Sequence, residues 1–258
     1  MSWEAELLVQ LVSTYLTQAA SYFIIVGLVY WVTRKWAAAL LAKRRIPVQG
    51  RALDGAQLRH EVGHSAVVLA FGAVQLAVIT QLQRLGYVRL PEDLGSWGVG
   101  GALLAVFLLT IGNDLWFYLV HRALHTPFLF RHVHKVHHRS VDLNPLTSYS
   151  FHLLEAVLIT GWLIPVLLLV PIPLPVIAVV QVVGLSNNVM AHLGYELLPR
   201  WWVKVPVLRW SNSATFHALH HQRSTGNYGL FTRLWDRLFG TELSGYEQAF
   251  AGEEAPRP

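Results

Sequence analysis

The sequence His121-Arg-Ala-Leu-His125 is the first of three histidine clusters in this chain. The other two are His134-Lys-Val-His137-His138 and His217-Ala-Leu-His220-His221. Spacings of three and four residues put side chains on one face of a helix, one turn apart. A packed set of neutral imidazoles suits metal ligation better than a hydrophobic core. The clusters, each at the edge of an apolar segment, therefore predict a metal centre at a membrane surface.

The composition points to an integral membrane protein. Of 258 residues, 53% are hydrophobic and only 14% are charged, and the mean hydropathy is +0.40, which is unusual for a soluble domain. The absence of cysteine excludes disulfides, thiolate metal sites and iron–sulfur clusters. Any metal must be held by nitrogen and oxygen. The basic residues flank apolar runs, so the net charge of +5 indicates membrane topology and not nucleic-acid binding.

Five apolar stretches are candidate membrane spans, near residues 15–32, 65–82, 100–120, 153–170 and 174–191. Each is about 18–21 residues long, which as helix matches the thickness of a bilayer core. A basic loop follows the first span and is expected to be cytoplasmic; its members are Lys35, Lys43, Arg44, Arg45 and Arg51. Counting spans from that loop brings all three clusters to the cytoplasmic side.

The expected fold is therefore an all-α, multi-pass transmembrane bundle of four or five spans. A cytoplasmic, histidine-rich helical cap would hold a dimetal centre, and residues 1–258 would form one domain. The sequence gives no indication of the oligomeric state.

A further histidine, His192, ends the last expected span, and Asn188 precedes it by one helical turn. Asn188 could bind a metal directly or through water. Eight or nine nitrogen ligands exceed the roughly four that one zinc ion takes, so two ions are implied. By ligand type alone, iron, copper, zinc and nickel are all compatible. The candidate metal ligands are His121, His125, His134, His137, His138, Asn188, His192, His217, His220 and His221.

Asp114 and Tyr118 share one helix face with His121 and His125. A carboxylate inside an apolar segment is costly unless it is paired, so Asp114 is a candidate functional residue. Asp114 and Tyr118 are both candidates for catalytic residues that act by supporting the ligands. It would accept a hydrogen bond from a ligand histidine or from another buried donor. The alternative is a simple ion pair with an arginine near the interface.

Several other polar residues have weaker signals. His132 would face away from the second cluster, and His152 and Glu155 would hydrogen-bond together or support a ligand. Asn227, Tyr228 and Asp236 are candidates for supporting the site or anchoring a loop. The final stretch, from Gln248, is expected to be a loose tail.

The combined pattern resembles the fatty acid hydroxylase/sterol desaturase superfamily. His121-x3-His125, His134-x2-His137-His138 and His217-x2-His220-His221 are similar to its three histidine boxes. Asn227-Tyr228-Gly229, followed by Trp235-Asp236-Arg237-Leu238-Phe239-Gly240-Thr241, is similar to the ending of that family. The resemblance covers about residues 100–241, which would be the catalytic region.

The resemblance implies a membrane enzyme with two iron ions (Fe2+/Fe3+) on the cytoplasmic side, ligated by the box histidines and His192. Zinc is possible as a substituting metal. Members use dioxygen as co-substrate to hydroxylate or desaturate lipids, and hydroxylation is favoured here. Electrons would come from a separate electron-transfer protein, because no glycine fingerprint for a dinucleotide follows a strand.

Two other functions remain open. His60-Glu61-Val62-Gly63-His64 matches the zincin pattern of an intramembrane zinc metalloprotease, with Glu61 as general base. That interpretation leaves the eight clustered histidines unexplained, and His60, Glu61 and His64 would instead make polar contacts near the interface. A non-enzymatic membrane carrier of metal or haem is the other alternative.

Overall fold

The computed structural model describes residues 2–46 and 53–252, and these residues form helices joined by loops and two isolated β-bridges. Four helical segments are long and apolar enough to cross a membrane: Trp3–Trp36, Gly55–Arg84, Gly95–Leu124 and Leu174–Ala191. The chain is therefore an all-α integral membrane protein, as the sequence predicts. Arg51 of the expected basic loop lies outside the described residues.

The spans correspond to α1 (Trp3–Trp31) with the π-helix η1 (Val32–Trp36), α3 (Gly55–Arg84), α4 (Gly98–Leu124) with the short 3-10 turn η3 (Gly95–Trp97), and α9 (Leu174–Ala191). The ends of these helices have local causes. The Asp54 side chain caps α3 by accepting from Gln57 N at 2.8 Å. Pro173 and Pro175 sit at the start of α9, where a missing N–H costs nothing.

The expectation of a single span over residues 153–170 is wrong. Two short helices occupy it, α7 (Leu153–Thr160) and α8 (Leu163–Leu169), with a turn at Gly161 and Trp162. Pro165 has no N–H to donate to the Gly161 carbonyl, which interrupts the helix at this place. A Cβ at Gly161 would also lie 2.9 Å from the Val157 carbonyl oxygen.

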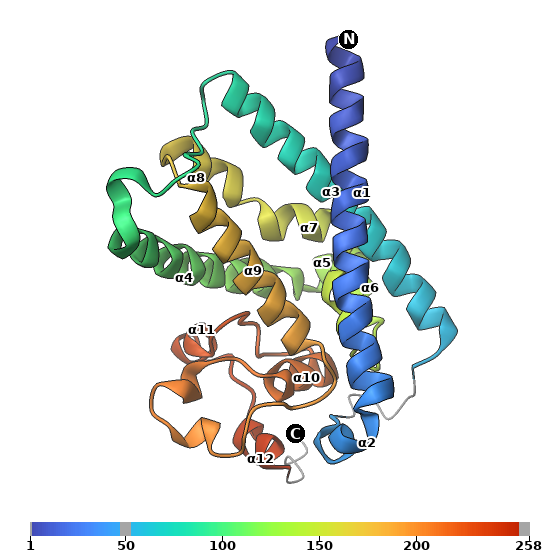
Figure 1. The fold of residues 1–258 in the computed structure, drawn as a ribbon. Coiled ribbons are helices and arrows are strands. Elements are labelled where there is room, and N and C mark those ends of the chain that lie inside the picture. Colours follow the sequence, from blue (N-terminus) through green and yellow to red (C-terminus); the bar gives the residue numbers. More distant parts are fainter. Residues whose placement is uncertain (1, 47–52, 253–258) are drawn as a thin grey trace.

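The long helices pack around two apolar clusters. Tyr22 and Val26 of α1 pack against Leu69 of α3 and Val189 of α9. The other cluster lies where α8 and the start of α9 meet the ends of α3 and α4. In Figure 1, α1 runs along one side of the molecule with the N-terminus far from the helices of the C-terminal cap.

The cap consists of short helices that follow the long ones. They are α5 (Pro127–Leu129), η4 (Phe130–His134), α6 (Lys135–His138), η5 (Pro145–Tyr149), η6 (Trp202–Lys204), η7 (Leu208–Trp210), α10 (Ala214–Arg223), α11 (Leu234–Leu238) and α12 (Tyr246–Ala251). The expectation of a loose tail from Gln248 is wrong as far as Ala251, because α12 buries Phe250 and Tyr246 against Phe216. Residues 253–258 lie outside the described part.

The basic segment after the first span and the histidine-bearing segments meet at one end of the bundle. Arg34 at the end of the first span forms an ion pair of 2.9 Å with Asp142, and Arg45 forms one of 3.0 Å. The Gly194 carbonyl, just after α9, accepts from Ile46 N at 2.9 Å. Helix α2 (Ala38–Leu41), with η2 (Ala42–Arg44), lies at the same end as α10 and α12 (Figure 1). The ends of the first span and of α9 thus lie at the same polar end of the bundle as the segment around Asp142.

Candidate metal centre

Nine histidines form two compact groups in this region. The first histidine group is His121, His125, His134, His138 and His220; the second is His137, His192, His217 and His221. Within each group, one nitrogen from every residue lies within 4.8 Å of all the others. Every box histidine and His192 thus belongs to one of the groups. The boxes do not map one to one onto the groups, because the second and third boxes contribute to both.

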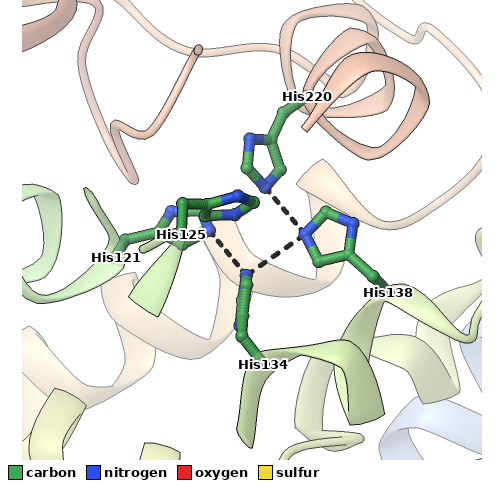
Figure 2. A group of neighbouring side chains, drawn as sticks. All are labelled: His121, His125, His134, His138 and His220. Carbon is green, nitrogen blue, oxygen red and sulfur yellow. Dashed lines mark hydrogen bonds between the residues drawn. The ribbon is translucent and has the colours of Figure 1, made fainter. Parts of the chain in front are cut away.

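The first group gathers residues from four elements, namely α4 with its C-cap, η4, α6 and α10 (Figure 2). His134 Nε2 lies 3.1 Å from His121 Nε2 of α4 and 3.1 Å from His138 Nε2. His138 Nε2 is in turn 3.1 Å from His220 Nε2 of α10. The His125 ring lies 4.6 Å from the His134 ring, centroid to centroid, and its buried Nε2 has no hydrogen-bond partner among the described residues.

The second group forms a closed ring of four Nε2 atoms. His137 lies 3.2 Å from His192, and His192 lies 2.8 Å from His217. His221 then completes the ring at 3.1 Å from both His217 and His137. All four side chains are buried.

Hydrogen bonds at the opposite ring nitrogen determine the tautomers. Nδ1 of His121 is bonded to the Tyr228 carbonyl and Nδ1 of His220 to the Gly226 carbonyl, both at 2.8 Å. Carbonyl oxygens only accept, so these Nδ1 atoms carry the proton and each Nε2 presents a lone pair.

The same arrangement recurs at three further histidines. Nδ1 of His134 donates to Glu155 Oε1 at 2.8 Å. Nδ1 of His192 donates to the Asn188 carbonyl at 2.7 Å, and Nδ1 of His137 donates to the Ser150 carbonyl at 3.3 Å. Five rings in all therefore direct an Nε2 lone pair into their group.

Burial keeps these rings neutral. It lowers the pKa of His134, His137 and His220 well below the ordinary value, and neighbouring imidazoles lower it further. It lowers the pKa of His125 and of His192 to about 4. Lone pairs about 3 Å apart repel one another unless a cation lies between them. Two ligands at about 90° on metal–nitrogen bonds of about 2.1 Å would be about 3.0 Å apart, so both groups fit a metal ion.

Helix ends add to this preference for a cation. His125 is the C-cap of α4 and His192 is the C-cap of α9. The C-terminus of a helix carries a partial negative charge, which favours a nearby cation. Two spans therefore end where positive charge would be bound.

The C-terminal segment holds the carbonyls that orient the first group. Asp236 accepts from Tyr228 N at 2.8 Å and from Gly229 N at 2.7 Å. Asn227 has a left-handed backbone (φ 59°), and its side chain bonds Phe216 O and Leu243 N. Asn227 and Asp236 thus anchor the loop, and the anchored loop supports the site by holding the carbonyls that orient two rings.

Asp114 and Tyr118 attach the same segment to α4. Asp114 accepts from Phe231 N at 2.7 Å, Thr232 Oγ1 at 2.6 Å and Trp235 Nε1 at 3.1 Å. Among the described residues, its hydrogen-bond donors include neither a histidine nor an arginine. The donors are other buried groups, which was one of the two expectations for a functional Asp114. Tyr118 Oη lies 3.0 Å from Thr241 Oγ1. Neither side chain belongs to a histidine group.

Comparison with known proteins places this geometry in a family. The family model described as fatty acid hydroxylase matches residues 106–241, more than half of the chain. The chain belongs to the fatty acid hydroxylase family. The resemblance seen in the histidine boxes is confirmed.

The relatives of this family member include enzymes of two named kinds. A very-long-chain aldehyde decarbonylase from rice, GL1-4, is 28% identical over 88% of the chain and 37% of its own length. A Delta(7)-sterol 5(6)-desaturase from Aspergillus fumigatus, erg3A, is 34% identical over 65% of the chain and 46% of its own length. The chain thus spans between a third and a half of these curated relatives. No solved structure matches.

Asn188, which precedes His192 by one turn, faces the second group in part. Its Nδ2 donates to the Ser148 carbonyl at 2.7 Å, and its own carbonyl accepts from His192. Asn188 also lines a small cavity of about 10 Å³ together with His137, His192 and His217. Its side-chain oxygen is the atom that could serve as a ligand, directly or through water.

Glu155 is the carboxylate that supports a histidine, a role that sequence reasoning left undecided. It is fully buried in the first turn of α7 and bonds His134. His152, expected as its possible partner, instead accepts from Leu154 N at 3.1 Å as the N-cap of α7. The feature of the sequence that indicates this role is that Glu155 is a lone acidic residue in an apolar stretch.

The zincin-like sequence contributes to neither group. Glu61 is fully buried and accepts from Gln57, Ser140, Asn144 and Thr147 at 2.8–3.1 Å. The ring centroids of His60 and His64 are 4.4 Å apart, but among the described residues no third histidine or carboxylate completes a metal site with them. The polar contacts that the sequence suggested as the alternative are therefore what the structure contains. His132 is exposed, as expected.

Proposed function

We propose that this protein is an integral-membrane di-iron oxygenase that hydroxylates or desaturates a C–H bond of a lipid, with hydroxylation favoured. The observation that carries the proposal is the pair of histidine groups, whose neutral rings converge through Nε2 at the ends of two spans. The named activities of the relatives, sterol desaturation and aldehyde decarbonylation, both act on apolar molecules.

In this proposal each histidine group holds one metal ion. The first group would supply five imidazole nitrogens, and the second four, with Asn188 completing it directly or through water. Ligands made only of nitrogen and oxygen suit iron, and also copper, nickel or substituting zinc. Iron, when bound, supplies the redox and dioxygen chemistry that side chains lack.

The chain itself performs the remaining tasks. Hydrogen bonds from Nδ1 to the carbonyls of Tyr228, Gly226 and Asn188 fix ring orientation. Burial of the second group keeps bulk water away from the ion that it would hold. The apolar side chains Phe117 and Phe151 border the cavity beside both groups, so an alkyl group reaching it would meet hydrocarbon and not solvent.

The site is assigned to the cytoplasmic side. Lys35, Lys43, Arg44 and Arg45 follow the first span at the same end of the bundle as the histidines, and basic loops favour the cytoplasm. Dioxygen would be the co-substrate, and a separate electron-transfer protein would supply electrons.

A long-chain aldehyde is a second candidate substrate. The rice decarbonylase aligns with 88% of the chain, whereas the Aspergillus desaturase aligns with 65%. On this alternative the substrate would be an aldehyde, and its carbonyl carbon at the end of an alkyl chain would lie beside the two histidine groups.

The test combines metal analysis with lipid analysis. We expect purified protein to bind two iron ions per chain, and cells that express it to contain a lipid heavier by one oxygen or lighter by two hydrogens. Cells that express His137→Ala are the control for chemistry that the host supplies. A shortened hydrocarbon in place of the aldehyde would favour the second candidate. One zinc per chain with unchanged lipids would contradict both.

A further inference from the structure

Glu155 differs from the other buried carboxylates of this protein. Its side chain is 1% exposed, and Oε1 lies 2.8 Å from His134 Nδ1. Oε2 is also buried and has no hydrogen-bond partner among residues 2–46 and 53–252. One oxygen of this carboxyl group thus hydrogen-bonds to a histidine of the first group, and the other makes no hydrogen bond among the described residues.

The comparison with Glu61, Asp114 and Asp236 makes the difference clear. Each of these carboxyl groups is fully buried and accepts at least three hydrogen bonds that use both of its oxygens. Leaving a buried oxygen without a partner is destabilising, and more so for a charged group. Those three carboxyl groups are structural anchors, whereas Glu155 keeps an atom available for another molecule.

The position of Glu155 identifies where that molecule would lie. Glu155 lines the cavity of about 10 Å³ that also borders His121 and His134 of the first group and His137 of the second. Such a volume holds about one water-sized group. Phe117, one turn before His121 on α4, and Phe151, just before α7, form apolar walls. The cavity therefore lies beside both histidine groups, bordered by residues of α4, α7 and α9.

We propose that Glu155 serves the first histidine group and the cavity together: Oε1 positions His134, and Oε2 hydrogen-bonds to the hydroxyl group of a lipid alcohol, which is the part of that molecule that the cavity is large enough to hold. This inference rests on the proposed function and names a contact that it leaves open. Asn188 and Asn212 also line the cavity, but their side-chain amides donate to backbone carbonyls and not to Oε2. A partner for Oε2 would therefore come from a bound molecule. The alcohol produced by hydroxylation carries such a group at the reacting carbon.

The positioning role is tested with iron alone. Wild-type protein, Glu155→Gln and Glu155→Leu are loaded with Fe2+, and both iron content and the Mössbauer spectrum are recorded. Glutamine retains an oxygen that can accept from His134 Nδ1, so we expect Glu155→Gln to keep two ions. Leucine removes that acceptor, and we expect one ion to bind about 10–100-fold more weakly with an altered spectrum.

The outcomes of this first experiment separate the two claims. If wild-type protein does not bind two irons, the proposed function fails. If it binds two and Glu155→Leu binds both with an unchanged spectrum, the positioning role fails instead. Should Glu155→Leu not fold, Glu155→Gln decides the matter, because loss of an ion in that variant would also contradict the role of an oxygen acceptor.

The cavity contact is tested with 1-dodecanol and dodecane as probes on iron-loaded protein. Both molecules have the same chain, and only the alcohol can bond Oε2. We expect the alcohol to perturb the iron spectrum of wild-type protein at about tenfold lower concentration than the alkane, as for a hydrogen bond of about 1.4 kcal/mol. Glu155→Leu should lose this preference. Equal responses of wild-type protein to both probes, as expected if water alone occupies the cavity, would overturn the contact.

Discussion

The Nδ1 atom of His121 donates to the Tyr228 carbonyl at 2.8 Å, although 107 residues separate them in the sequence. Tyr228 is held in turn by Asp236, which accepts from the amides of Tyr228 and Gly229. The loop after α10 thus controls the orientation of a ring on α4. A residue that touches no candidate ligand side chain can therefore affect the first histidine group.

This relationship predicts that Asp236→Ala weakens metal binding by the first group. The substitution leaves two buried backbone amides without their acceptor, at a cost of about 1–3 kcal/mol each. We expect the protein to unfold at a lower temperature and to retain less than its full iron content, measured by thermal unfolding and metal analysis. Glu92→Ala, at an exposed position, is the control. Full iron content in Asp236→Ala would show that the carbonyl does not need this support.

The two groups should lose metal at different rates. His125 and His138 of the first group are partly exposed, whereas all four members of the second are buried. A soluble chelator therefore reaches the first group more easily. We expect two phases of iron release, with His138→Ala removing the fast phase. A single phase for both ions would contradict the difference in accessibility.

Much of the site could be predicted from the sequence because its ligands are distinctive side chains at helical spacing. The boxes and His192 come together in two groups, and four of the five proposed spans are long helices. The carbonyls of Gly226, Tyr228 and Ser150 could not be predicted in the same way. Every residue has a carbonyl, so only the folded backbone selects the ones that orient a ring.

The errors also have physical causes. Hydropathy alone favoured a span over residues 153–170, but Pro165 interrupts it and two short helices form. Asp114 is in the expected buried position, yet its partners come from residues 230–235, which no helical spacing connects to it. Local patterns locate a polar residue, while its partner depends on tertiary packing.

The metal-free protein should be destabilised by acid. Burial lowers the pKa of His125 and of His192 to about 4, whereas histidine in the unfolded chain has a pKa of about 6.5. Between these values the unfolded chain binds more protons, so stability falls as pH decreases from about 6.5 towards 4. Each such group adds a slope of about 1.4 kcal/mol per pH unit.

The measurement is chemical unfolding of chelator-treated protein in detergent across this range of pH. His132→Ala is the control, because His132 is exposed and its loss should leave the slope unchanged. His192→Ala should reduce the slope. Stability that is constant between pH 6.5 and pH 4 would mean that the buried rings are charged in the folded protein, which would conflict with metal ligation by neutral imidazole.

Substitutions in the zincin-like sequence distinguish a di-iron oxygenase from a zinc metalloprotease. His60 Nε2 is bonded to the Val136 carbonyl at 3.0 Å, outside both histidine groups. We expect His60→Ala to keep two irons and most of the activity, and His137→Ala to lose the ion of the second group together with activity. Glu61→Gln places an amide N–H among the donors Ser140, Asn144 and Thr147, so it should cost about 1–3 kcal/mol of stability.

In a protease of the zincin type, Glu61 would be the general base, and Glu61→Gln would abolish activity without reducing stability. If Glu61 instead serves only as a structural hydrogen-bond acceptor, Glu61→Gln should lower stability, and the fraction that folds should retain activity. Thermal unfolding and lipid turnover measured on the same preparation distinguish these cases. A stable, inactive Glu61→Gln protein together with loss of metal in His60→Ala would reject the di-iron assignment.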